Sequence, residues 1–187
     1  MTGVQTCALP IFTSRFAAAV RIFDERVDAA FDRIRSPRLD PVAYAVSSAA
    51  DHSLCWHATG VTRELLGTGD LGRAARFSLA MGAESAITNG PVKACFRQVR
   101  PADYADIEFH HGLRRPVTSS FPSGHATAAF CPATLLGGGP VAYSAAAAVS
   151  ATRIYVRLHH ASDVLAGAAF GLGLGFAFRR FVNGRPR

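Results

Sequence analysis

Three short segments of this sequence carry residue types that are suited to moving a phosphate group. They are Lys93-x6-Arg100-Pro101, Pro122-Ser123-Gly124-His125 and Arg153-x5-His159-x3-Asp163. Together they contain two imidazoles, a carboxylate and three fixed cations. Phosphoryl transfer depends mainly on a positioned nucleophile, a proton donor and stabilisation of charge. The segments therefore predict a phosphate-transfer site.

His159 and Asp163 are four residues apart, so on a helix they would lie on one face, one turn from each other. The carboxylate of Asp163 could then accept the Nδ1 proton of His159 and leave a lone pair on Nε2. This pairing predicts that the imidazole is itself the nucleophile. Because Asp163 precedes an apolar run over 164–178, we expect it in the first turn of a helix, where negative charge is favoured.

The second segment is typical of a turn that leads into a helix. Pro122 and Gly124 favour the turn, Ser123 is a good N-cap, and an alanine-rich run over 126–136 follows. The N-terminus of a helix offers unpaired N–H groups to an anion. His125 would stand beside that anion and could donate a proton to a leaving oxygen.

Lys93, Arg100 and Arg153 supply the positive charge that such a site needs. The planar fork of arginine matches phosphate oxygens, and lysine acts as a point charge. Taken singly, each of these cations is more often an ordinary surface residue, and a histidine beside an apolar helix is more often structural. Because these cations and histidines occur together in three ordered segments, a catalytic site is favoured over these separate explanations.

In these motifs the chain resembles the type 2 phosphatidic acid phosphatase and vanadium-dependent haloperoxidase superfamily. That family's pattern is Lys-x6-Arg-Pro, then Pro-Ser-Gly-His, then Ser-Arg-x5-His-x3-Asp, and all three parts are present over residues 93–163. The one departure is Thr152, where the family usually has serine. Threonine keeps the hydroxyl group, so the resemblance stands.

The resemblance implies metal-independent hydrolysis of a phosphomonoester or diphosphate, without a cofactor. It implies that His159 forms a phosphohistidine, that Asp163 orients it, and that His125 is the acid for the leaving group and then the base for water. The implied phosphate-binding residues are Lys93, Arg100, Ser123, Gly124 through its N–H, and Arg153.

The composition favours a single, apolar domain. The chain has 187 residues, of which 49% are hydrophobic and 18% charged, against roughly 25% charged in ordinary soluble domains. Its mean hydropathy of +0.17 is low for a multi-spanning protein, but alanine and glycine suit close helix packing in membranes. The net charge is +7, yet no basic stretch alternates with aromatic residues, so we expect no nucleic-acid partner.

The cysteines and paired histidines give little support to a metal site. Cys7, Cys55, Cys95 and Cys131 are widely spaced and form neither a paired-cysteine motif nor a disulfide framework. The pairs His110-His111 and His159-His160 have few acidic partners, so we expect no metal. The oligomeric state is left open.

The first eleven residues back-translate to a string that is similar to a sequencing-library adapter. We therefore exclude residues 1–11 as an artefact and treat 12–187 as a single phosphatase domain. We expect that the natural N-terminus is missing from this sequence, and an upstream membrane span could have been lost with it.

Hydrophobic periodicity predicts an all-α fold. An amphipathic helix over 14–35 is too polar to span a membrane, and it could lie at a membrane interface or pack on the bundle. The other predicted helical stretches are 41–61, 73–96, 125–137, 140–158 and 163–182. We expect a membrane-embedded bundle of about five core helices plus the N-terminal amphipathic helix. The polar loop over 97–123 is expected to cover the site and contact substrate.

The catalytic segments fall at one end of this predicted bundle. Arginines gather at the opposite end, namely Arg73, Arg76, Arg179, Arg180, Arg185 and Arg187. By the positive-inside rule, the arginine-rich end is cytoplasmic. We therefore expect an integral protein of the cell membrane with its active site on the extracytoplasmic side.

The sequence thus predicts a membrane phosphatase that acts on a lipid phosphate or a lipid diphosphate such as polyprenyl diphosphate. Two alternatives within the same chemistry are a soluble acid phosphatase acting on small esters and a vanadate-dependent haloperoxidase. A non-catalytic lipid-binding protein would be expected to lack one of the residues His125, His159 and Asp163.

Overall fold

The computed structural model describes residues 14–50, 53–67, 69–101 and 118–184, and within these ranges all regular structure is helical. The elements are α1 (Ser14–Ile34), α2 (Asp40–Ala49), α3 (Leu54–Gly67), α4 (Leu71–Ile87), the short π-helical turn η2 (Thr88–Val92), α5 (Gly124–Leu135), α6 (Pro140–Tyr155) and α7 (Ala161–Asn183). The predicted all-α fold class is confirmed.

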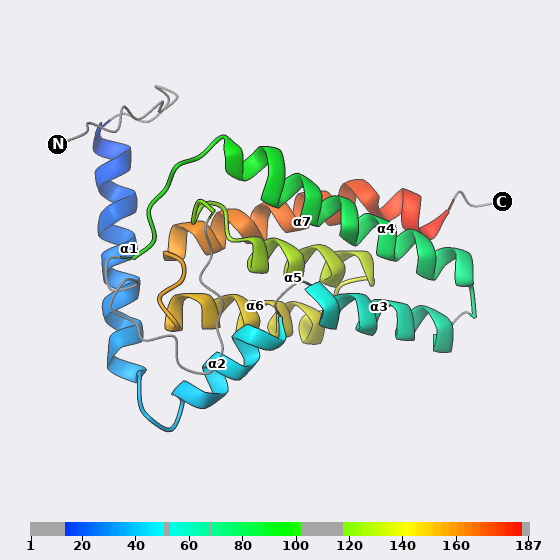
Figure 1. Cartoon of the computed structure of the whole chain (residues 1–187), viewed down its shortest axis with the longest axis horizontal. Helices are drawn as coiled ribbons and strands as arrows, with labels where there is room; N and C mark the ends of the chain where they lie inside the picture. The colour runs from blue at the N-terminus through cyan, green and yellow to red at the C-terminus, as the bar shows by residue number, and fades with distance from the viewer. Residues whose placement is uncertain (1–13, 51–52, 68, 102–117, 185–187) are drawn as a thin grey trace.

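The long helices form a bundle with α5 at its centre. In Figure 1, α4, α5, α6 and α7 run along the long axis of the molecule, and α1 lies crosswise at one end. α5 contacts α3, α4, α6 and α7. Every residue from Ala126 to Leu135 is buried except Phe130, which is half-buried. A short helix that is apolar nearly all round is suited to this central position.

Glycines bring α7 into close contact with α5. Gly167, Gly171 and Gly175 are four residues apart, so they lie on one face of α7. A Cβ atom built on Gly167 would lie 2.4 Å from the carbonyl oxygen of Ser123, and one on Gly171 would lie 2.5 Å from that of Thr127. Small residues at this spacing let the helix backbones approach each other. The packing therefore holds the start of α5 against the start of α7.

Several element boundaries differ from those predicted. The stretch 41–61 is two helices, because α2 ends at Ala49 and α3 begins only at Leu54. Ser53, directly before α3, has a φ of 59°, which is not helical. α3 then continues to Gly67, beyond the end of the predicted helical stretch 41–61. The predicted helix 73–96 divides at residue 87 because Gly90 leaves helical geometry (φ −93°, ψ −106°) and Pro91 follows.

α1 packs on the bundle, although only part of its apolar face is covered. Val27 and Phe31 pack beside Ile154 and Val164. Other large apolar residues of α1 remain exposed, namely Phe16, Ile22, Phe23 and Ile34. The face that packs on the bundle is mixed, because Asp24, which is buried, and Asp28, which is half-buried, lie on it beside Val27 and Phe31. This differs from the simple amphipathic pattern, because Asp24 accepts two hydrogen bonds from Ser162 and is buried by that contact.

Among the described residues, α7 alone is both long and apolar enough to cross a bilayer, judged by its length and composition. It has 23 residues, close to the number that a membrane-spanning helix requires. α5 and α6 are shorter, with 12 and 16 residues.

Candidate active site

The motif residues gather at the end of the bundle that α1 crosses. Figure 1 shows that the end of η2, the start of α5, the end of α6 and the start of α7 all lie at this end. Ser123 is the N-cap of α5, and its hydroxyl oxygen accepts a hydrogen bond from the Ala126 N–H at 3.5 Å. The backbone N–H of Ser123 donates to the carbonyl oxygen of Asp163 at 3.0 Å. The turn of the second motif is thus joined directly to the helix of the third.

His159 faces Asp163, but from outside the helix. α7 begins at Ala161, so His159 precedes its N-cap residue His160, whereas Asp163 lies in the first turn as predicted. Nδ1 of His159 is 3.5 Å from Oδ2 of Asp163, which is longer than a formed hydrogen bond. The same carboxylate oxygen accepts the N–H of His160 at 3.0 Å. Asp163 therefore caps its own helix and faces the imidazole at the same time.

Arg100 occupies the opposite side of the imidazole. Its Nη1 donates to the carbonyl oxygen of Leu158 at 2.5 Å and lies 3.5 Å from Nε2 of His159. Its Nη2 donates to the carbonyl oxygen of Thr118 at 3.2 Å. The ring thus has a carboxylate beside Nδ1 and a guanidinium beside Nε2, which favours the tautomer with its proton on Nδ1. The free lone pair then points toward the cation that would hold a phosphate.

Lys93 approaches the site through the kink of η2. A Cβ atom on Gly124 would lie 3.5 Å from Nζ of Lys93 and 3.0 Å from Oδ1 of Asn89. The ammonium group is therefore beside the first residue of α5, where unpaired N–H groups face an incoming anion. Asn89 was not predicted as a site residue. No motif marks it, because its place beside Gly124 arises from the path of η2.

Arg153, in the last turn of α6, is buried and donates a hydrogen bond from Nη1 to Oγ of Ser47. Ser47 is fully buried on α2, so α2 contributes to orienting this guanidinium. No motif marks Ser47, and its contact with Arg153, 106 residues away along the chain, has no local sequence signal. His125, the second residue of α5, is half-buried. A positive charge on its ring lowers the pKa of His159.

The electrostatics of the site favour a neutral His159 and a bound anion. Burial lowers the pKa of His159 well below its usual 6.5, and the positive charges of Arg153, Arg100 and Lys93 lower it further. Burial and these two arginines also lower the pKa of Lys93 to about 8. A phosphate would relieve the repulsion among the three cations. The imidazole can meanwhile keep its lone pair at neutral pH.

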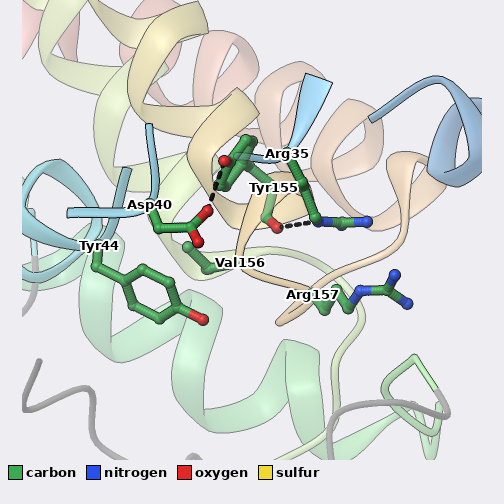
Figure 2. Close-up of a pocket in the computed structure, with 6 residues that line it drawn as sticks. All are labelled: Arg35, Asp40, Tyr44, Tyr155, Val156 and Arg157. Carbon is green, nitrogen blue, oxygen red and sulfur yellow. Dashed lines mark hydrogen bonds between the residues drawn. The ribbon is translucent and has the colours of Figure 1, made fainter. Parts of the chain in front are cut away.

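A small cavity of about 150 Å³ lies beside the site but contains none of its predicted residues. Figure 2 shows Arg35, Asp40, Tyr44, Tyr155, Val156 and Arg157 around it. Both arginines pair with Asp32, and Asp40 accepts a hydrogen bond from Tyr155 Oη at 2.6 Å. The charges are therefore balanced within the protein, which indicates a structural role for this cluster.

The predicted covering loop falls largely outside the described residues, as do His110 and His111. Of its stretch, residues 97–101 and 118–123 are described. They form the strap that carries Arg100 and returns to α5, with Ser120 N–H donating to the carbonyl oxygen of Gln98 at 3.1 Å.

Residues 73–187 match the sequence profile of the PAP2 superfamily. The chain is 29% identical, over 157 residues, to a decaprenylphosphoryl-5-phosphoribose phosphatase of Mycobacterium tuberculosis, covering 81% of this chain and 85% of that protein.

Two crystal structures share the fold. One is a transmembrane PAP2-type phosphatidylglycerolphosphate phosphatase from Bacillus subtilis, with a TM-score of 0.72, 24% identity, and coverage of 95% of this chain and 90% of that one. The other is LpxE from Aquifex aeolicus, with a TM-score of 0.63, 24% identity, and coverage of 82% and 92%.

Proposed function

Because this chain belongs to the PAP2 superfamily and is a phosphate-ester hydrolase, we propose that it hydrolyses a lipid phosphate or lipid diphosphate through a phosphohistidine at His159. One observation carries the mechanistic part of this proposal. The buried imidazole is bracketed by Asp163 on Nδ1 and by Arg100 on Nε2, each at 3.5 Å. That arrangement supports the proposal, because it orients one ring nitrogen and leaves positive charge beside the other.

In the first step, Nε2 of His159 attacks phosphorus and the bond between phosphorus and the leaving oxygen breaks. His125 gives its proton to that oxygen. The equatorial oxygens are held by Lys93, Arg100 and Arg153, together with the N–H groups at the start of α5. Asp163 holds the Nδ1 proton and stabilises the positive charge that forms on the ring.

In the second step, water attacks the phosphohistidine in line. His125, now neutral, takes a proton from the water, and the bond between phosphorus and Nε2 breaks. Phosphate leaves and both histidines return to their starting states. Each residue is thereby restored, and the reaction consumes one water molecule for each phosphate released.

The lipid part of the proposal rests on similarity and composition. The M. tuberculosis relative is named for a decaprenyl-linked substrate, and the B. subtilis neighbour for a phosphatidylglycerol phosphate. α7 has the length and composition of a membrane span. Apolar helices that end at a cationic site would let a lipid tail stay in the bilayer while its phosphate reaches His159.

We further propose that the protein is integral to the cell membrane with this site on the extracytoplasmic side. Arg73 and Arg76 lie near the start of α4, and Arg179 and Arg180 near the end of α7. In Figure 1 both of those helix ends lie at the end of the bundle far from α1. The positive-inside rule assigns such an arginine-rich end to the cytoplasm.

The experiment that tests the function is phosphate release by purified protein in detergent, with a metal chelator present throughout. Wild type and His159→Ala are compared on a panel of lipid phosphates and one soluble ester. We expect release that requires His159, resists the chelator and is fastest on a lipid substrate. Equal or faster release from the soluble ester would favour the small-ester alternative. Full activity of His159→Ala would contradict the assignment of the nucleophile.

A further inference from the structure

His159 lies in a short turn, residues 156–160, between the end of α6 and the start of α7. This turn is strained, because Arg157 has a φ of 54°, a conformation that residues other than glycine rarely adopt. We propose that α1 is a brace that holds this turn at both ends and so positions His159 for the reaction. The proposal rests on the proposed function and adds Asp24 to it as a positioning residue.

The first contact is at the end of α6. Arg35, directly after α1, donates from Nε to the carbonyl oxygen of Tyr155 at 2.8 Å and from Nη2 to that of Ile154 at 3.1 Å. The last carbonyl groups of a helix have no partner within it, and a cation is favourable there. Figure 2 shows the Nε contact, together with the hydrogen bond from Tyr155 to Asp40. The guanidinium thus fixes the point at which the turn begins.

The second contact is at the start of α7. Asp24 accepts the backbone N–H of Ser162 on Oδ1 and the hydroxyl of Ser162 on Oδ2, both at 2.7 Å. It is only 7% exposed, and it lies 138 residues away along the chain. A carboxylate at this position stabilises the first turn of the helix and interacts favourably with its dipole. That same turn carries Asp163.

Two further contacts lie between these ends. Asp32 pairs with Arg157 at 2.6 Å, and Oδ2 of Asp28 is 3.6 Å from Nδ1 of His160. Asp24, Asp28 and Asp32 are spaced by four residues, so they form one row along α1. The row contacts residues on both sides of His159 and leaves the imidazole itself to Asp163 and Arg100.

The brace is separate from the packing that holds the bundle together. The close contact between α5 and α7 depends on the glycines of α7. α1 contributes partly covered apolar residues at one end, and several of its large side chains remain exposed. Loss of Asp24 should therefore loosen the turn without unfolding the bundle. A displacement of the nucleophile of about 1 Å can lower a rate by about 100-fold.

The test compares Asp24→Ala with Asp24→Asn and with Glu25→Ala in the full-length protein. Asparagine can still accept the Ser162 N–H. Glu25 is the neighbouring residue on the exposed side of α1, where its side chain is 67% exposed and pairs only loosely with Arg21 at 3.8 Å. Amide hydrogen exchange over 157–162, kcat, KM and the unfolding temperature are measured for each variant. If Asp24→Ala does not fold, Ser162→Ala removes the hydroxyl half of the same contact.

We expect Asp24→Ala to exchange these amides at least about tenfold faster and to lose about 10- to 100-fold in kcat, with KM unchanged. Asp24→Asn should recover most of the loss, and Glu25→Ala should match wild type. Unchanged exchange over 157–162 in Asp24→Ala would overturn the proposal, and so would an undiminished kcat. Amide exchange can be measured without turnover, so it tests the brace by itself. A wild type that releases no phosphate would instead show that the proposed function has failed.

Discussion

At the residue scale, the site is defined by how opposite charges are placed around one imidazole. Asp163 and Arg100 both lie 3.5 Å from ring nitrogens of His159, and catalytic hydrogen bonds often tighten only when substrate binds. The departure from the family pattern at Thr152 has a simple structural reading. Its hydroxyl donates backward to the carbonyl oxygen of Val149 at 2.7 Å, so it is used within α6.

The pKa of Lys93 predicts how activity depends on pH. Because that pKa is lowered to about 8, raising the pH through about 8 removes a proton from the free enzyme and with it one phosphate-binding charge. We therefore expect kcat/KM to fall above pH 8, since kcat/KM reports the free enzyme. On the acid side, the lowered pKa of His159 keeps its lone pair available below pH 6.5.

The matched variant is Lys93→Arg, because a guanidinium stays charged throughout this range. Its kcat/KM should be lower overall, since an arginine does not reproduce the point charge of lysine, but it should no longer fall near pH 8. Profiles of kcat/KM from pH 5 to 10 on one substrate make the comparison. An alkaline fall that is identical in both proteins would show that another group titrates there.

At the element scale, the contact between α5 and α7 aligns two of the three motifs. The three glycines of α7 face backbone or side-chain atoms of α5 at distances that a methyl group could not occupy. The same contact carries the hydrogen bond from Ser123 N–H to the carbonyl oxygen of Asp163. Helix packing and site geometry are thus coupled.

Gly171→Ala should separate α7 from α5, because its Cβ would meet the carbonyl oxygen of Thr127 at 2.5 Å. We expect a loss of about 1–3 kcal/mol of stability and reduced phosphate release. The matched control is Gly173→Ala, where a Cβ would meet nothing within 4 Å and alanine should stabilise the helix by about 0.5–1 kcal/mol. Thermal unfolding in detergent measures both. Equal unfolding temperatures would contradict the packing argument.

Local sequence signals predicted some elements well. Ser123 caps α5 as expected because N-capping depends on residues that are adjacent in the chain. The division of the stretch 41–61 and the position of Asp24 were not predictable in this way. Asp24 falls within the predicted amphipathic helix over 14–35, and its burial depends on Ser162, which lies 138 residues away. Contacts of this range have no periodic signature.

At the scale of the whole molecule, the bundle brings four helix ends to one site and α1 closes that end (Figure 1). The motifs predicted which residues would meet there, because their chemistry is specific. They gave no sign of Ser47 or Asn89, whose roles arise from the paths of α2 and η2 beside Arg153 and Gly124. The residues that lie beside the motif residues, Ser47 and Asn89, are therefore brought to the site by the fold.

If phosphate passes through His159, the phosphorylated enzyme can be trapped during turnover. Protein is mixed with a lipid substrate whose terminal phosphate is radiolabelled and is quenched in alkali, where phosphohistidine survives and acid would destroy it. The labelled peptide is then identified by mass spectrometry. We expect label on His159 in wild type and none in His159→Ala. Label on another residue, or undiminished label in His159→Ala, would contradict a phosphohistidine at His159.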